Sequence, residues 1–138
     1  MPETSRDFQK AAVQRLTTAA FLLEHKYNLD AFYLTGYAVE CTLKALILRL
    51  AERDGRGAEV LVKIGSGAKM HNAEVLSGLL KDAGISIPPA VKAEINKVSR
   101  TYHWTTALRY ETHRLRTDWT RGFVNTARVI LEWVEGQL

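Results

Sequence analysis

FYLTGYAVECTLKALILR, residues 32–49, is apolar on nearly every side and carries an acidic and a basic residue one helical turn apart. Its apolar residues run without alternation over more length than a strand takes, which predicts a helix. A helix that is apolar all round is buried inside a protein. Glu40 precedes Lys44 by four residues, the favourable order for an ion pair, and Tyr37 shares their face. In such surroundings we expect the pair either to join an internal network or to form part of a functional site.

The composition predicts a single globular domain over residues 1–138. The chain has 46% hydrophobic and 25% charged residues, as soluble proteins do. A single Cys41 in the apolar helix predicts a packed, reduced thiol and a cytoplasmic location. The polar first ten residues lack the apolar run of a secretory signal. No membrane contact is expected, because insertion of the apolar helix would be costly for Asp30, Glu40, Lys44 and Arg49.

Hydrophobic periodicity predicts further helices on both sides of this stretch. Before it, apolar residues at three- and four-residue steps predict a helix over 5–27, capped by Ser5. The break at 28–30 is short, so this helix is expected to lie antiparallel to a second helix that ends near residue 53.

After the apolar stretch, start signals mark three more helices. Asn72 precedes a helix over 73–83, and Pro89 opens one that extends to about residue 101. A last helix begins near residue 117. It carries on one face Trp119, Phe123, Ala127, Ile130 and Val134.

Two segments lack a clear apolar stripe. Residues 54–69 are rich in glycine and predict a long loop, with at most a short helical or extended piece over 60–64. Residues 102–116 are polar, aromatic and basic, and predict an ordered connector. With no convincing strand, the sequence predicts an all-α helical bundle.

The connector and the start of the last helix are basic. The net charge is +4, and between residues 109 and 128 there are five arginines, with His113, against Glu111 and Asp118. This pattern is typical either of a solvated face or of one that binds an anion such as RNA, a nucleotide or an acidic protein. The residues expected to contact such a ligand are Arg109, His113, Arg114 and Arg116.

Four residues of the connector suggest more specific roles. Arg109 and His113 are four residues apart, so on a helix they would share one face and could together hold and act on a phosphodiester. Tyr110 and Trp104 could stack on a base, or pack in the core.

Other classes of site are not indicated. No histidine, cysteine or acidic residues have the spacing of metal ligands, so no metal or cofactor is expected. Residues 65–69, GSGAK, are followed by Met70 rather than the serine or threonine of a phosphate-binding loop. His71 is interpreted as a helix-entry residue.

Three elements together resemble the HEPN domain. They are Tyr37-x-x-Glu40-x-x-x-Lys44, then Lys69-x-His71 at a helix entry, then Trp104-x4-Arg109-Tyr110. The resemblance covers most of the chain and implies a prokaryotic up-and-down bundle of four to five helices. Such a bundle often dimerises, with the second and last helices beside a shared groove. Many HEPN proteins are ribonucleases, including toxins paired with a nucleotidyltransferase antitoxin.

The resemblance stops at the catalytic motif. HEPN ribonucleases carry Arg-x4-6-His, whereas Arg109 and His113 have only three residues between them. We therefore expect a binding or partner module for a nucleotide, RNA or a nucleotidyltransferase, acting as a homodimer. The alternative is a metal-independent toxin-type ribonuclease that uses Arg109 and His113 across a dimer groove, with Glu40 and Lys44 organising that groove.

Overall fold

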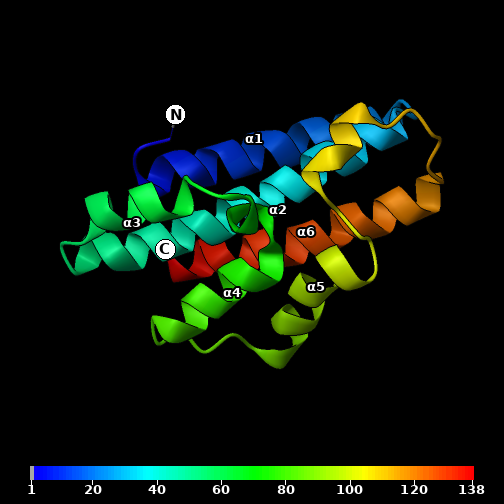
Figure 1. Cartoon of the computed structure of the whole chain (residues 1–138). Helices are drawn as coiled ribbons and strands as arrows, with labels where there is room; N and C mark the ends of the chain where they lie inside the picture. The colour runs from blue at the N-terminus through cyan, green and yellow to red at the C-terminus, as the bar shows by residue number, and fades with distance from the viewer. Residues whose placement is uncertain (1) are drawn as a thin grey trace.

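A computed structural model describes residues 2–138, which form six α-helices and two short 3-10 helices with no strand. The long helices are α1 (Ser5–Glu24), α2 (Asn28–Arg53) and α6 (Thr117–Gln137). They lie side by side, with α1 and α2 antiparallel (Figure 1). The all-α bundle predicted from the sequence is confirmed, with six helices instead of four to five.

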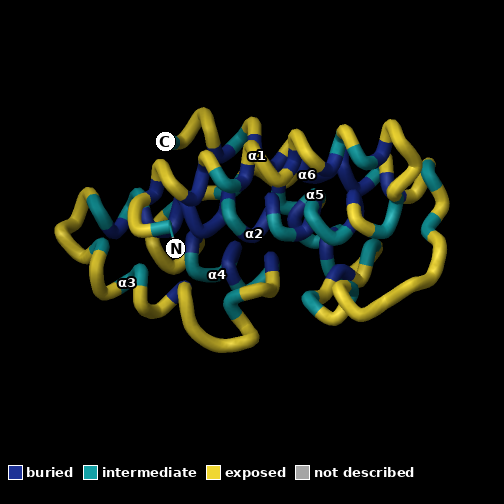
Figure 2. The backbone as a smooth tube through the Cα atoms, turned by 90° about the horizontal axis from the view of Figure 1, so that it is seen from above, coloured by how far each residue is buried: buried dark blue, intermediate teal, exposed yellow. Residues whose placement is uncertain are grey.

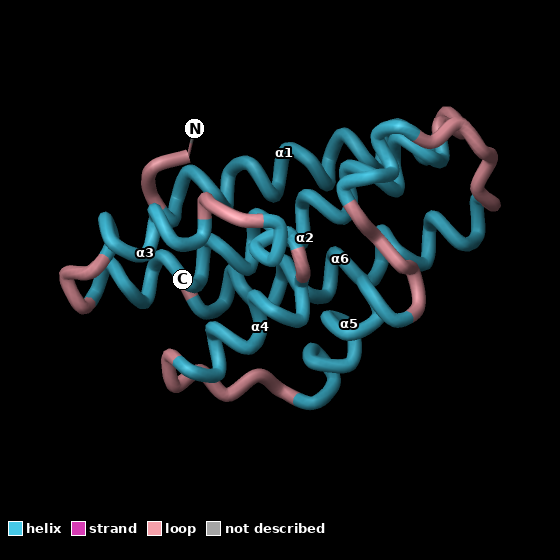
Figure 3. The backbone as a smooth tube through the Cα atoms, viewed as in Figure 1, coloured by secondary structure: helices cyan, strands magenta, loops and turns pink. Residues whose placement is uncertain are grey.

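The shorter elements cover the rest of α2 and α6. They are α3 (Gly57–Ile64), η1 (Ala68–His71), α4 (Ala73–Asp82), α5 (Pro89–Arg100) and η2 (Thr106–Tyr110). Helices α3 and α4 pack on α2, α5 packs on α4 and α6, and η2 lies against α2. Loops lie in the connections between these helices and in the segment before α1 (Figure 3).

The additional helix is α3, which lies within the predicted loop over 54–69. Its glycines stand at the ends of the helix, at Gly57 and after Ile64, so they do not interrupt its turns. Only Ile64 is buried, against the core. A short helix of this kind depends on tertiary packing, which local sequence signals do not report.

Helix α2 is the centre of the bundle. It buries 15 of its 26 residues, because α1, α6, α3 and α4 cover it from different sides. Figure 2 shows the buried backbone concentrated along this helix. By length and composition α2 could also cross a membrane. Of the apolar stretch of α2 that meets this test, 78% is buried inside the protein.

Several predicted helix ends are confirmed and others shift. Asn72 caps α4, since its side chain accepts hydrogen bonds from two backbone N–H groups, and Pro89 opens α5. Thr4 caps α1 in place of the predicted Ser5. Helix α1 ends at Glu24 rather than near residue 27, and Lys26 then adopts the left-handed conformation with φ 63°.

The predicted apolar face of α6 is correct apart from its first member. Trp119 is 41% exposed and packs edge-on against Tyr102, with ring centroids 4.9 Å apart. This residue lies in the first turn of α6, where fewer neighbouring elements remain to cover it. The buried members are Phe123, Ala127, Ile130 and Val134.

Candidate functional site

The ion pair predicted on α2 is present and buried. Lys44 Nζ donates to Glu40 Oε2 at 3.0 Å, and the two side chains are 7% and 8% exposed. Charges removed from water in this way depend on good hydrogen-bond geometry to offset their desolvation. The surrounding helices therefore hold both groups in fixed positions.

A third residue completes this network. His71 Nδ1 lies 2.7 Å from Glu40 Oε1, so both carboxylate oxygens of Glu40 have a partner. Because an ionised carboxylate only accepts hydrogen bonds, Nδ1 carries the proton and donates it. The His71 side chain remains 42% exposed. We call Tyr37, Glu40, Lys44 and His71 the α2 polar cluster.

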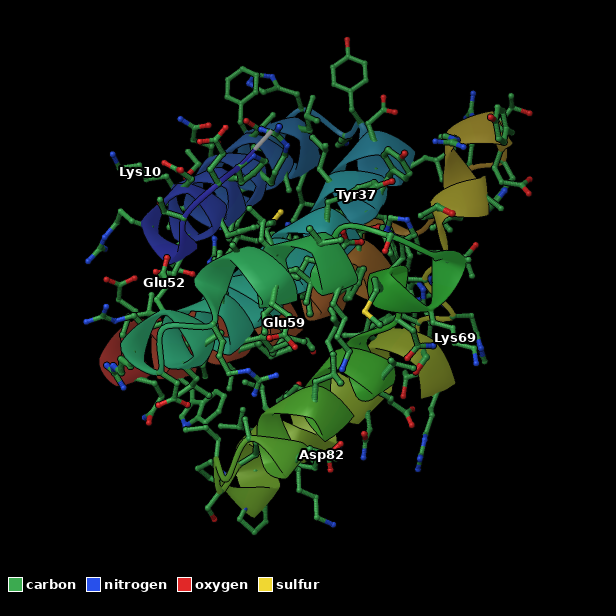
Figure 4. The ribbon with its side chains drawn as sticks, turned by 60° about the vertical axis from the view of Figure 1, so that its left-hand side comes forward. Lys10, Tyr37, Glu52, Glu59, Lys69 and Asp82 are labelled. Atoms are coloured by element: carbon green, nitrogen blue, oxygen red, sulfur yellow. The ribbon has the colours of Figure 1, made fainter. Side chains whose placement is uncertain are left out.

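Tyr37 also belongs to an aromatic group with Tyr33 and Trp104, which we call the aromatic wall. Tyr37 lies edge-on to both His71 and Trp104, at centroid distances of 6.5 Å and 5.1 Å. Burial, followed by the hydrogen bond with the Tyr33 hydroxyl, raises the pKa of Tyr37, so its hydroxyl keeps its proton. In Figure 4, Tyr37 comes from α2 and Lys69 from η1.

Trp104 packs into the core, as the second of the two sequence interpretations expected. It is 6% exposed, and its indole Nε1 donates to the Tyr33 carbonyl at 3.0 Å. The indole lies directly on Gly36, where an added Cβ would stand 1.9 Å from Cε2 of Trp104. Glycine is therefore required at this position of α2, and the Trp104 ring has little surface left for a base.

Arg109 lies on η2, beside the aromatic wall. Its guanidinium stands over the Tyr110 ring, 4.9 Å from the centroid, and Tyr110 is 75% exposed. The positive charge of Arg109 offsets part of the burial-driven rise in the pKa of Tyr37. Arg109 thus belongs to the surface next to the α2 polar cluster, and Tyr110 is available for stacking.

His113 lies elsewhere. The short helix η2 ends at Tyr110, and residues 111–116 have no helical structure. The shared helical face that would bring Arg109 and His113 together is therefore not formed. Instead, His113 lines a cleft of about 590 Å³ between residues 26–30 and the connector.

We call this the connector cleft. Three basic side chains line it, Lys26, His113 and Arg114, and Tyr27 beside them is 60% exposed. The acidic residues Asp30 and Glu111 line it as well, and a carboxylate oxygen of Glu111 stands 3.6 Å from His113 Nδ1. The cleft therefore combines charges of both signs with an exposed aromatic ring.

Asn28 links the two sides of the cleft, the start of α2 and the end of the connector, by hydrogen bonds. Its Nδ2 donates to the Leu115 carbonyl at 2.9 Å and to Thr117 Oγ1 at 3.0 Å. Arg116, which was also expected to contact a ligand, instead makes two hydrogen bonds to the Asp118 carboxylate. Of the predicted contact residues, the structure thus brings His113 and Arg114 together, with Arg109 and Arg116 outside the cleft.

The sequence analysis missed Lys26 and Tyr27 as members of this site. No pattern in the sequence around these two residues indicates a contact with the connector, which lies some 85 residues later. The signal that could have found them is topological. Because α1 and α2 are antiparallel and α6 packs on both, the turn between α1 and α2 meets the start of α6.

Within residues 2–138, no group of three His, Cys, Asp or Glu side chains could hold a metal ion. Comparison of the chain with protein-family models, with curated proteins and with solved structures finds no match.

Proposed function

We propose that this protein is a HEPN-like helical binding module that holds an anionic nucleotide or RNA segment in the connector cleft. The observation that carries this proposal is the convergence of Lys26, His113 and Arg114, with Tyr27, on one cleft of about 590 Å³ that Asp30 and Glu111 also line. Cationic side chains bind phosphates, and an exposed aromatic ring can stack on any base. This combination is typical of sites that bind single-stranded nucleic acid.

The proposal includes a second copy of the chain as partner. Between α1 and α6 runs a shallow groove with Val13, which is 49% exposed, and Leu131. Arg128 and Glu132 border the same groove, so two copies related by a two-fold axis would set opposite charges against each other. A separately encoded nucleotidyltransferase is the other partner that the HEPN resemblance supports.

The alternative function is a toxin-type ribonuclease. In a single chain Arg109 and His113 lie in different surroundings, so this function requires Arg109 of one protomer to meet His113 of the partner subunit. Both side chains are exposed. Their exposure is the observation that keeps this alternative open to test.

Binding to a fluorescent single-stranded RNA, measured by anisotropy at several salt concentrations, tests the main proposal. We expect affinity to fall with salt, and Arg114→Ala and Lys26→Ala each to weaken binding several-fold with a shallower salt dependence. The matched control is Arg6→Ala, which removes one exposed positive charge at the opposite end of α1. Equal loss in all three variants would contradict a site in the cleft.

The same RNA, analysed for cleavage, separates the two functions. The binding module leaves the RNA intact, whereas the ribonuclease cleaves it and loses this activity in an Arg109→Ala/His113→Ala variant. Sedimentation across micromolar concentrations tests the dimer, since a monomer throughout would contradict it.

A further inference from the structure

The α2 polar cluster presents one imidazole nitrogen in a defined chemical state. Glu40 Oε1 lies 2.7 Å from His71 Nδ1 and holds the ring proton on that nitrogen. In the neutral ring the lone pair therefore lies on Nε2. Within residues 2–138, Nε2 of His71 has no protein hydrogen-bond partner, and the side chain is 42% exposed. The result is a free nucleophilic nitrogen on a ring that a buried carboxylate holds in place.

Lys44 holds the Glu40 carboxylate in its position beside His71. Its ammonium group binds the second oxygen of Glu40 at 3.0 Å, which holds the carboxylate in position. A fixed negative charge next to Nδ1 stabilises any state in which the imidazole ring becomes positive. Such a state forms whenever Nε2 bonds to an electrophile.

The surroundings favour an electrophile that carries negative charge. The four-residue turn η1 contains Lys69 and no acidic residue, and the positive charge of Arg109 acts on the neighbouring Tyr37. The connector cleft, and a second cleft between α2, α3 and α4 that basic residues also line, lie elsewhere. An exposed ring of this kind can accept a small group.

We propose that His71 is a phosphorylation site, whose Nε2 accepts a phosphoryl group from a donor with a phosphorus–nitrogen bond. The bond from Nε2 to phosphorus forms as the phosphorus–nitrogen bond of the donor breaks. With phosphoramidate, whose nitrogen is already protonated, ammonia leaves with the bonding electron pair. The Nδ1 proton stays in place, and Glu40 balances the positive charge of the phosphorylated ring. This site is independent of the connector cleft and of any RNA bound there.

Incubation of the purified protein with phosphoramidate tests the proposal. Peptide mapping at alkaline pH, where phosphohistidine is stable, gives the initial rate at each of the four histidines. His25, His103 and His113 are exposed and lack a buried carboxylate, so they serve as internal controls. We expect His71 to react about tenfold faster than each of them, the gain of a charge-assisted over a neutral hydrogen bond. Equal rates at all four histidines would overturn the proposal.

Two variants and one spectrum identify the cause of the reactivity. Glu40→Gln keeps an acceptor for Nδ1–H but removes its charge, and we expect the rate at His71 to fall to that of the other histidines. His71→Gln should lose the label at this site alone. If Glu40→Gln fails to fold by circular dichroism, nitrogen-15 spectra of the unaltered protein decide the point. A His71 ring protonated on Nε2 instead of Nδ1 would contradict the mechanism.

Discussion

The α2 polar cluster and the connector cleft both gather charged groups, and they use them in opposite ways. In the cluster, Glu40 and Lys44 are buried, and each is held by a partner at hydrogen-bond distance. In the cleft, His113 is half exposed, and its acidic neighbour Glu111 stands 3.6 Å away. Buried charges must be satisfied inside the protein, whereas exposed charges remain available to a ligand. The cluster is therefore expected to matter for stability, and the cleft for binding.

The largest effect should come from Glu40→Ala. This change leaves the ammonium group of Lys44 buried without its partner, which typically costs about 3–5 kcal/mol of the free energy of unfolding. The matched control is Glu111→Ala, which removes an exposed carboxylate of the cleft and should change stability by less than about 0.5 kcal/mol. Urea denaturation of both variants measures the difference, and similar midpoints would erase the contrast between the two regions.

Gly36→Ala should have the next largest effect. The new methyl group would overlap the Trp104 indole, three of whose ring atoms lie within 2.2 Å of the added Cβ. Forced repacking of this kind costs about 1–3 kcal/mol. Gly78→Ala is the control, because it lies in α4 with nothing within 4 Å of the added Cβ. Thermal denaturation should show a lower midpoint for the first variant and an equal or higher midpoint for the second.

Cys41 reports on the burial of α2 by its chemistry. Burial, with a smaller contribution from Glu40, raises the pKa of this thiol from 9.0 to about 11. At pH 8 the thiolate fraction, and with it the alkylation rate by iodoacetamide, should be about 100-fold lower than for an exposed cysteine. The rate in the native protein is compared with the rate in urea. Equally fast alkylation of the native and the urea-treated protein would show that Cys41 on α2 is not buried.

The smallest change in stability is expected for Arg114→Ala. Its side chain is exposed, so the free energy of unfolding should move by less than about 0.5 kcal/mol while RNA affinity falls. Denaturation and anisotropy on the same preparation measure both quantities. A variant that lost binding only because it was destabilised would not support the division between the two regions.

Local patterns predicted much of this architecture. The spacing of Glu40 and Lys44 on an apolar helix indicated a buried ion pair, because residues four apart on a helix are neighbours whatever the rest of the fold does. Asn72 and Pro89 were correct as helix starts, because a helix start also depends on residues that are close in sequence. What local patterns could not supply were contacts between distant segments.

The contact of His71 with Glu40 shows this limit. The two residues are 31 positions apart, and a glycine-rich segment with an additional helix, α3, lies between them. The connector cleft has the same origin, since Lys26 meets His113 only through helix packing. Conversely, Arg109 and His113 do not share the expected helical face, because the backbone is extended at Glu111, directly after η2.

The central position of α2 has a consequence for synthesis of the chain. Part of its apolar surface is covered by α6, the last of the six helices to leave the ribosome. At about 5–20 residues per second, the interval between emergence of Arg53 and of Gln137 is about 4–17 seconds. During that interval α2 is covered on fewer sides than in the finished bundle. The segment that defines the fold therefore exposes apolar surface that needs protection from aggregation in the nascent chain.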